Sequence, residues 1–363
     1  MQIDRSSKMT RMQKSITAYF WLRLLALGFI IHGCKAESSL QNTEKTPEKK
    51  SIKSGQEWYD TDGKLIQSHG GGMLYHEGIY YWYGENKDTA TKFPRLRTDI
   101  IGINCYSSTD FYNWKNEGIV LPAVKDDPGS ALYPKNVLER PKVIFNDKTG
   151  KFIMWFHVDD SLYQKAHVGI AVSDSPKGPF IFKESFRPLG FESRDMTVFK
   201  DDDGKAYLVF GSGWHNKIVI AELSEDYLSL NGPYTTHLHT DGPPLGREAP
   251  ALFKRKGKYY LITSGTTGWF TNPAQCDVAE NINGPYKTIG NPCEGMYAEV
   301  TFLGQSTHVQ KIQGKEDAFV FMADRWIPTD LKNSRYLWLP VQFNKNNEPV
   351  LKWINEWDMD FYK

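Results

Sequence analysis

The chain of 363 residues is long enough for one large domain or two ordinary ones, and its hydrophobic content of 40% is sufficient for a proper core. Lys and Arg number 44 against 43 Asp and Glu, so the formal net charge is +1, and the basic residues form only short, scattered runs. This balance argues against nucleic acid as a partner, because a phosphate backbone requires clustered cations.

The first 34 residues predict an export signal. Basic residues between Arg5 and Lys14 precede the apolar stretch AYFWLRLLALGFIIHGC, which is short for a membrane span and ends at Cys34. The ending IHGC is similar to a bacterial lipobox, which predicts Cys34 as the lipid-bearing N-terminus after cleavage. We therefore expect an exported protein of the periplasm or cell envelope, with an outer-membrane lipoprotein as its lipidated form.

A polar segment follows the predicted signal. Residues 35–53 contain EKTPEKKS and are typical of a flexible tether. The folded domain is therefore expected at residues 54–363, with no second folded domain.

The sequence indicates no cofactor. Cys276 and Cys293 are close enough in sequence to pair in an oxidising compartment, which would leave Cys105 alone. The chain has no CxxC pair and no His/Cys ligand spacing, so we expect no zinc site. The glycines at 70–72 lack the Lys-Ser/Thr of a phosphate loop. The acidic run at 201–204 falls in a hairpin turn without EF-hand spacing, so a structural calcium ion is compatible with the sequence but not indicated by it.

One hairpin pattern recurs five times along the predicted domain. Each copy has a short apolar strand, a turn with a glycine and an aromatic-rich strand. The turn glycines are Gly78, Gly150, Gly204, Gly257 and Gly314, and the last three intervals between them are 54, 53 and 57 residues. Further strand and turn patterns lie between the hairpins. Five repeats of about four strands each predict an all-β fold, a five-bladed β-propeller.

A polar residue precedes the first strand of every hairpin. Nine residues before the turn glycine, or slightly more in the second copy with its longer turn, stand His69, Glu139, Asp195, Glu248 and Gln305. Equivalent positions of all blades face one central region, so these side chains should converge. Like charges that converge in a cleft destabilise a fold unless something binds there, so their presence indicates a functional site. Three carboxylates in an aromatic-rich chain indicate glycoside cleavage, in which one acid protonates the leaving oxygen and another group activates water.

From about Trp58 onward the chain resembles glycoside hydrolase family 43. The resemblance rests on HGGGMLYHEGIYYWYGENK, ERPKVIFN, SRDMTVFKDDDGKAYLVF, REAPALFKRKGKYYLITSGTTGW and GQSTHVQ. It implies a five-bladed propeller that hydrolyses with inversion, and it is closest to the exo-β-1,3-galactanase branch. Glu248 matches the family's general acid and Asp195 its pKa modulator, in agreement with the rule that a neighbouring carboxylate raises the pKa of a proton donor.

The residues leave the general base open. Most family members carry an Asp on the first blade, where this chain has His69. The galactanase branch is similar in that loss, and there the residue that matches Gln305 is proposed to hold the water, as an imidic acid tautomer. Glu139 is an alternative base by its chemistry, although in the branch it resembles a residue that binds sugar hydroxyls. Neutral His69 is a further alternative, and we rank Gln305 first, Glu139 second and His69 third.

Further residues are expected to bind the sugar. Arg140 and Arg194 neighbour the acids and should hold them by charge-assisted hydrogen bonds, Tyr163 and Asn216 resemble pocket residues of the branch, and the Gly-flanked Trp269 is expected to be a platform. The predicted substrate-binding residues are His69, Glu85, Arg140, Tyr163, Arg194, Asn216, Thr266, Gly268 and Trp269.

The leading hypothesis is a monomeric exo-galactanase, a galactan 1,3-β-galactosidase, that releases galactose from the β-1,3-galactan backbone of a plant polysaccharide such as arabinogalactan. An α-L-arabinofuranosidase or β-xylosidase of the same family is an alternative, against which the missing first-blade Asp argues. A non-catalytic glycan-binding propeller is another alternative. The presence of both Glu248 and Asp195 argues against it, since binding alone needs no proton donor with a modulator.

Overall fold

The computed structural model describes residues 48–363. The predicted signal, Cys34 and most of the predicted tether lie outside the described residues. Strand β1 (Ile52–Lys53) pairs with β24 (Glu356–Trp357), so ordered structure begins before the predicted domain boundary at residue 54. Within 48–363, no helix is long and apolar enough to cross a membrane.

Four antiparallel sheets contain four strands each, and in every one the strands follow chain order. The first contains β2 (His69–His76), β3 (Ile79–Glu85), β4 (Gly102–Ser108) and β5 (Lys115–Pro122). The second contains β6 (Val137–Asn146), β7 (Lys151–Asp159), β8 (His167–Ser173) and β9 (Ile181–Phe186). The third contains β10 (Met196–Lys200), β11 (Ala206–Ser212), β12 (Lys217–Glu222) and β13 (Tyr234–His237). The fourth contains β14 (Arg247–Arg255), β15 (Lys258–Gly265), β16 (Gln275–Ala279) and β17 (Lys287–Gly290).

Two sheets of three strands complete the fold. One contains β19 (Gln305–Lys311), β20 (Phe319–Arg325) and β21 (Arg335–Pro340). The other contains β18 (Cys293–Glu294), β23 (Pro349–Lys352) and β22 (Gln342–Phe343). Four short 3₁₀ turns are also present among the described residues: η1 (Pro188–Gly190), η2 (Ala298–Leu303), η3 (Leu331–Asn333) and η4 (Met359–Tyr362).

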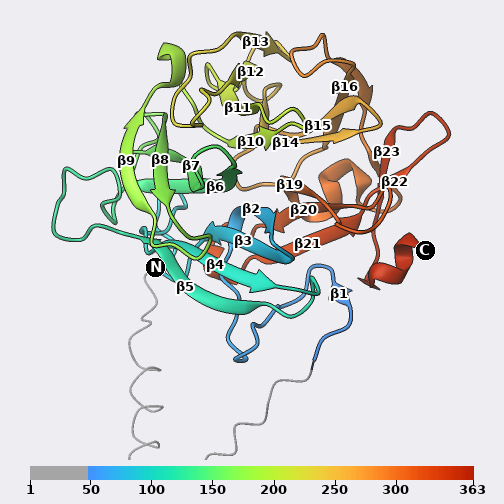
Figure 1. Ribbon diagram of the computed structural model, residues 1–363, viewed down its shortest axis with the longest axis horizontal. Coiled ribbons are helices and arrows are strands. Elements are labelled where there is room, and N and C mark those ends of the chain that lie inside the picture. Colours follow the sequence, from blue (N-terminus) through green and yellow to red (C-terminus); the bar gives the residue numbers. More distant parts are fainter. Residues whose placement is uncertain (1–47) are drawn as a thin grey trace, which may run out of the picture. The chain divides into compact units, whose positions relative to one another are not determined.

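The sheets are arranged as a β-propeller. The first strands β2, β6, β10, β14 and β19 contact one another in this order, and β19 contacts β2. Figure 1 shows these strands around a common centre, with the later strands of each sheet farther out. The ring closes on itself, which covers the inner edges of the sheets. The predicted all-β propeller is thus confirmed.

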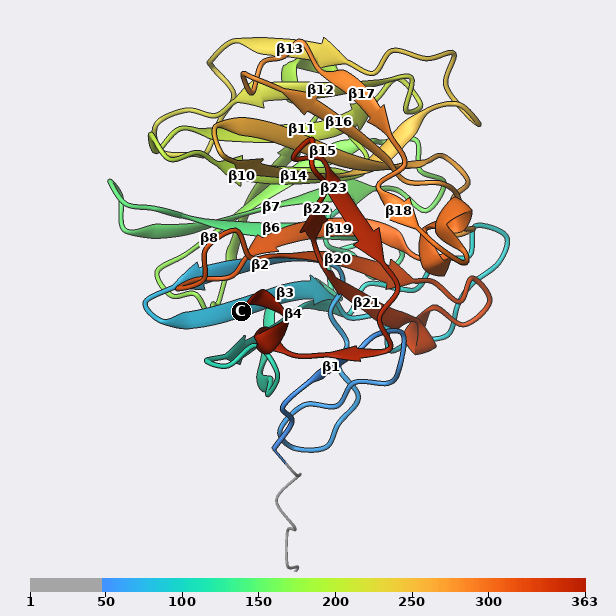
Figure 2. The same ribbon diagram turned by 90° about the vertical axis from the view of Figure 1, so that its right-hand side faces the viewer.

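The predicted number of five blades is wrong, since the described chain forms six sheets of three or four strands. Five of them contain the recurring hairpins. The sixth combines the parallel pair β18 and β23 with the short strand β22, and β23 contacts β21. Figure 2, which views the molecule from the right-hand side of Figure 1, shows β18, β22 and β23 facing the viewer. Strands this short, brought together from separate parts of the chain, carry no hairpin pattern that counting repeats could detect.

The recurring turn glycine has a conformational reason. Gly78, Gly150, Gly204, Gly257 and Gly314 all have positive φ, between 66° and 84°. This left-handed region is freely available to glycine and costs other residues energy. The same requirement in five hairpins explains the sequence period.

Aromatic residues fill the space between the first sheet and the β19–β21 sheet. Trp82, Trp114 and Trp338 are almost completely buried. The rings of Trp82 and Trp338 lie 4.8 Å apart at 63°, and those of Trp114 and Trp338 lie 5.8 Å apart at 90°. Edge-to-face pairs of this kind stabilise the fold by more than the area that they bury.

Cys105, Cys276 and Cys293 are buried free thiols. Cys276 and Cys293 therefore do not form the disulfide that their spacing in the sequence would permit.

Candidate active site

A bulge lies within the first few residues of four of the five inner strands. The register shifts after His69 in β2, after Glu139 in β6, after Glu248 in β14 and after Ser306 in β19. The residues that follow the first three, Gly70, Arg140 and Ala249, have φ of 59°, 56° and 52°. A non-glycine residue in this region costs roughly 1–2 kcal/mol. Such strain persists where the surroundings hold it, which is typical of functional sites, and a bulge re-aims the side chains next to it.

A cavity of about 240 Å³ lies at the end of the propeller where the inner strands begin. Ten residues that the sequence predicted for the site line it: Glu85, Glu139, Arg140, Tyr163, Arg194, Asp195, Glu248, Gly268, Trp269 and Gln305. Five lining residues were not predicted: Arg95, His157, Trp214, His215 and Trp326. The structure thus brings four acidic side chains, several cations and three tryptophans around one small space.

Glu248 is buried at the start of β14. Its Oε1 accepts a hydrogen bond of 2.9 Å from Gln305 Nε2, and its Oε2 lies 3.4 Å from His215 Nε2. Burial and the charge of Asp195 raise the pKa of Glu248 well above its usual value, although Arg140 and Arg247 oppose the rise. The raised pKa favours the form of this side chain that carries a proton. Because Oε1 already accepts from Gln305, that proton belongs on Oε2.

Asp195 is clamped by Arg140. The guanidinium donates from Nε to Oδ1 at 3.1 Å and from Nη2 to Oδ2 at 2.8 Å. Such a two-point contact fixes the plane of the carboxylate as well as its charge. The backbone of Arg140 is itself held, since its N–H donates to Glu85 Oε1 at 2.9 Å and its carbonyl accepts from Lys142 Nζ at 3.4 Å.

Gln305 uses its whole hydrogen-bonding capacity. Its Oε1 accepts from Arg140 Nη2 at 2.6 Å and from Trp326 Nε1 at 2.9 Å. Its Nε2 donates to Glu248 Oε1 at 2.9 Å and to Ser264 Oγ at 3.2 Å. An amide oxygen that accepts two bonds and a nitrogen that donates two leave no free partner. A water that binds to this side chain must replace one of these four contacts.

Glu139 belongs to a buried charge chain. It accepts a hydrogen bond of 3.0 Å from Tyr163 Oη, and its Oε2 lies 3.4 Å from His157 Nδ1. Burial alone would raise the pKa of Glu139, but His157 and Lys87 together lower it to about 2. His157 Nε2 lies 3.0 Å from Asp159 Oδ2. Burial opposes a charge on His157, yet Asp159 and Glu139 raise its pKa to about 9, so the imidazolium is the main form at neutral pH.

Lys87 lies between Glu139 and Glu85, and Glu85 accepts a hydrogen bond from the backbone of Arg140. Glu85 Oε2 lies 2.6 Å from Lys87 Nζ, which in turn is 3.9 Å from Glu139 Oε1. The ammonium also lies 4.9 Å from the ring centroid of Trp269. Burial raises the pKa of Glu85, whereas Lys87 lowers it. The cation thus ties the acidic side chains to the wall of the cavity.

His215 lies beside the proposed acid. Burial lowers its pKa to about 4, so the ring is neutral at neutral pH, and its Nδ1 is buried without a partner among the described residues. Nearby, the guanidinium of Arg194 lies 4.1 Å from the ring centroid of the exposed Trp214.

Three predicted binding residues do not line the cavity: His69, Asn216 and Thr266. His69 is completely buried, with Nδ1 3.1 Å from Asp324 Oδ1 and Nε2 3.5 Å from Tyr336 Oη. Its ring also stacks on Tyr336. This placement disagrees with the prediction that His69 binds sugar or activates water, because the bulge that follows it leaves the ring packed against the β19–β21 sheet.

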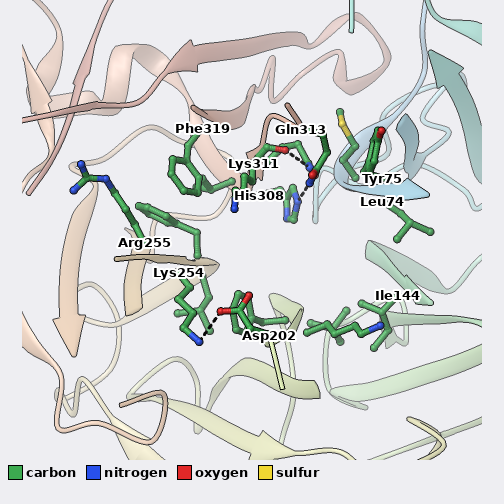
Figure 3. Close-up of a pocket in the computed structure, with 18 of the residues that line it drawn as sticks. Leu74, Tyr75, Ile144, Asp202, Lys254, Arg255, His308, Lys311, Gln313 and Phe319 are labelled. Atoms are coloured by element: carbon green, nitrogen blue, oxygen red, sulfur yellow. Dashed lines mark hydrogen bonds and ion pairs between the residues drawn. The ribbon is translucent and has the colours of Figure 1, made fainter. Parts of the chain in front are cut away.

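A larger cavity, of about 610 Å³, opens at the other end of the inner strands, among the hairpin turns. Figure 3 shows His308, Lys254 and Asp202 around it, and the last two form an ion pair of 2.9 Å. Its cations are largely matched by carboxylates, and burial lowers the pKa of His308 to about 3. It holds no pair of converging acids like those at the first cavity. Among residues 48–363, no group of three or more His, Cys, Asp or Glu is arranged to hold a metal ion.

The model of glycosyl hydrolases family 43 matches residues 71–347, which extend from within β2 to beyond β22. The chain belongs to this family.

Solved structures of family 43 enzymes are similar over most of the chain. A β-1,3-galactosidase solved with galactodeoxynojirimycin is 42% identical, with a TM-score of 0.78 over 85% of this chain and 100% of its own. The exo-β-1,3-galactanase of Phanerochaete chrysosporium solved with β-1,3-galactotriose is 33% identical, with a TM-score of 0.77 over 86% of this chain and 68% of its own.

Curated relatives are similar over shorter stretches. The β-D-galactofuranosidase of Aspergillus niger is 30% identical over 51% of this chain, and the β-xylosidase of Xylanibacter ruminicola is 40% identical over 49%. The family 43 chain spans 55% and 63% of the lengths of these two relatives.

Proposed function

We propose that this family 43 enzyme releases galactose from the non-reducing end of β-1,3-galactan, with inversion at the anomeric carbon. The observation that carries the proposal is Glu248, a buried acid whose pKa is raised well above its usual value beside the clamped Asp195. An acid with a raised pKa keeps its proton to higher pH and can donate it to a leaving oxygen. The similarity to β-1,3-galactosidases and galactanases supports the choice of substrate.

The chemical step needs one proton donor and one water. Glu248 gives its proton to the glycosidic oxygen while the bond from that oxygen to the anomeric carbon breaks. A water adds to the same carbon from the opposite face, and its proton leaves to a base. This displacement produces galactose and a shortened chain, and it inverts the configuration.

Gln305 is the proposed holder of the water, with Glu139 as a binder of sugar hydroxyls. A carboxylate with a pKa of about 2 is a weak base, which supports a binding role for Glu139. His69 has no place at the cavity and is a poor third choice. The hydrogen bond from Gln305 Nε2 to Glu248 changes when Glu248 loses its proton. We therefore expect this hydrogen bond to be the one that the water replaces.

The size of the cavity supports exo action. A space of about 240 Å³ accommodates about one sugar ring, in contrast to the long cleft that an internal cut requires. Trp269 and Trp326, whose ring centroids lie 4.8 Å apart, form part of its wall.

The test is hydrolysis of β-1,3-galactan, followed by proton NMR from the first minutes. We expect α-galactose first, followed by mutarotation, and no product from Glu248→Gln. Appearance of β-galactose first would contradict inversion. Binding of the polymer without any release would indicate a glycan-binding propeller instead.

A second candidate is a β-xylosidase or α-L-arabinofuranosidase, favoured by the 40% identity to a β-xylosidase over 49% of the chain. Aryl β-xylosides and aryl α-L-arabinofuranosides measure it directly. A kcat/KM on either that exceeds that on an aryl β-galactoside would replace the galactan proposal.

Export is proposed from the sequence. The apolar stretch that ends in IHGC supports this proposal. Cys34 would carry the lipid and anchor a monomeric enzyme in the cell envelope. The expected result is incorporation of labelled palmitate into the full chain but not into Cys34→Ala. A labelled Cys34→Ala chain would contradict the proposal.

A further inference from the structure

A second groove lies outside the catalytic cavity. It has a volume of about 870 Å³, within the range of roughly 300–1,000 Å³ that is usual for small-ligand sites. The lining residues are Glu294, Gly295, Met296, Tyr297, Phe302, Leu303, Arg325, Lys352 and Trp353, and these residues define the Trp353 groove. Strands β18 and β23, which end at the groove, are labelled in Figure 2.

Large apolar side chains are exposed there. Met296 is 80% exposed, Tyr297 55% and Trp353 36%. A cluster of exposed apolar residues with a polar rim usually marks an interaction site. Flat aromatic rings of this kind can stack against the apolar face of a sugar ring.

The backbone under the groove is held rigidly. Tyr297, Phe302 and Leu303 have φ of 65°, 55° and 66°, a costly conformation for such residues. Thr301 anchors the segment, since its Oγ1 donates to the carbonyl of Asn272 at 2.8 Å and accepts from the backbone N–H of Ala274 at 2.8 Å. The groove is therefore preformed, which reduces the entropy lost when a ligand binds.

Arg325 contributes an unmatched charge. Its guanidinium lies 5.3 Å from the ring centroid of Trp353, and it makes no hydrogen bond or ion pair with any residue from 48 to 363. Gly55 leaves room for it, because a Cβ there would lie 2.3 Å from Arg325 Nη1. By contrast, Lys352 is matched by Glu294 at 3.3 Å. A half-buried guanidinium that has no anionic partner in the protein favours a ligand that supplies an anionic group.

The Trp353 groove and the catalytic cavity share two short segments. Leu303 precedes Gln305 by two residues at the start of β19, and Arg325 stands directly before Trp326 at the end of β20. The ends of these two paired strands place both sites at the same end of the β19–β21 sheet. The groove therefore lies at the same end of this sheet as the cavity that is proposed to receive the polymer.

We propose that the Trp353 groove is a second glycan site, which binds an anionic sugar unit, a pyranose that carries a carboxylate or a sulfate group. The aromatic rings receive the sugar ring and Arg325 receives the anion. The inference rests on the proposed function in one respect, since it assumes that the natural ligand is a glycan. Binding at the groove requires no hydrolysis, so a failure of the proposed activity would leave it unaffected.

Fluorine NMR of the protein labelled with 5-fluorotryptophan separates the two sites. The Trp353 signal is assigned by its loss in Trp353→Phe, and Trp214, Trp269 and Trp326 report the catalytic cavity. The probes are methyl β-D-glucuronide, galactose 6-sulfate, methyl β-D-galactoside and inorganic sulfate. We expect the two anionic sugars to shift the Trp353 signal, and Arg325→Gln to weaken this binding by about tenfold or more, as loss of a charge-assisted hydrogen bond implies.

Arg187→Gln is the matched control, because it removes an arginine that does not line the groove and lies 3.9 Å from Glu192. It should leave the binding unchanged, and unshifted cavity signals in Arg325→Gln would show that the fold is intact. The sugar that binds more tightly shows whether the groove prefers a carboxylate or a sulfate group. The proposal is overturned if neither sugar shifts Trp353, if Arg325→Gln binds as the wild type does, or if inorganic sulfate produces the same shift at the same concentration. It is also overturned if dilution alone shifts the signal, since a second copy of the chain would then occupy the groove.

Discussion

Arg140 and Asp195 form a bidentate ion pair at the centre of the site, with N···O distances of 3.1 and 2.8 Å. The same guanidinium donates to Gln305 Oε1 at 2.6 Å and to the carbonyl of Ser306 at 2.9 Å. One cation thus orients the carboxylate that raises the pKa of Glu248 and the amide that is proposed to hold the water. To reach this position, Arg140 adopts a left-handed backbone conformation with φ of 56°, which costs energy in a residue other than glycine.

Asp195→Asn should move the basic limb of the pH profile to lower pH. The charge of Asp195 is, after burial, the largest cause that raises the pKa of Glu248. Without it, and with Arg140 no longer neutralised, Glu248 loses its proton at lower pH. The check is kcat/KM on an aryl β-galactoside across the pH range. Asp147→Asn, at the other end of the inner strands, is the control. An unchanged limb in Asp195→Asn would show that Asp195 does not set this pKa.

Glu248→Gln should remove activity without loss of stability. Loss of a general acid typically costs about 10²–10⁴-fold in rate. A buried carboxyl with a raised pKa favours folding below its unfolded pKa and opposes it once pH rises through the folded pKa. An uncharged amide avoids that penalty, so the variant should become more stable than the wild type as pH rises. Denaturant unfolding at several pH values measures this, and a variant that is less stable at high pH would contradict the assignment.

The hairpin register predicted most of the site. Counting back from the turn glycines identified Glu139, Asp195, Glu248 and Gln305, and all four line the cavity. His69 has the same register, but its ring is buried against Tyr336. The reason is local, since the run of three glycines in its bulge allows β2 to approach its neighbours closely.

Five lining residues outside that register were not found from sequence. His157 is the cross-strand partner of Glu139, and Trp326 stands two residues after Asp324, the partner of Gln305, so a count across each turn would have indicated this region for both. His215 lies in the connection between β11 and β12, with φ of 63°, and no repeat pattern reaches it. The sixth sheet was missed because its strands have only two to four residues.

His157→Gln should destabilise the protein in a pH-dependent way. A raised pKa of about 9, against 6.5 for the free side chain, means that His157 contributes stability below pH 6.5 that is lost as pH rises through about 9. The lowered pKa of Glu139 adds stability above pH 4.5 that is lost as pH falls toward about 2. The cost of the variant should therefore be largest between pH 4.5 and 6.5, at about 3–5 kcal/mol, the range for removal of one partner from a buried pair.

Urea unfolding of the wild type and of His157→Gln at about pH 5.5 and about pH 9.5 tests this expectation. His76→Gln removes a partly exposed histidine near Glu77 and serves as the control. An equal loss of stability at both pH values would mean that His157 acts by packing and not by charge.

Gln305→Glu should move the basic limb in the opposite direction from Asp195→Asn. The new carboxylate would stand where Gln305 Nε2 now lies 2.9 Å from Glu248 Oε1. Two carboxyl groups at this distance share a proton, so the upper pKa of the pair rises and the acid form persists to higher pH. Gln310→Glu places the same charge on the same strand near its other end, beside His308, and should leave the limb in place. If both Gln305→Glu and Asp195→Asn shifted the limb downward, the limb would report a group other than Glu248, and the assignment of the general acid would have to change.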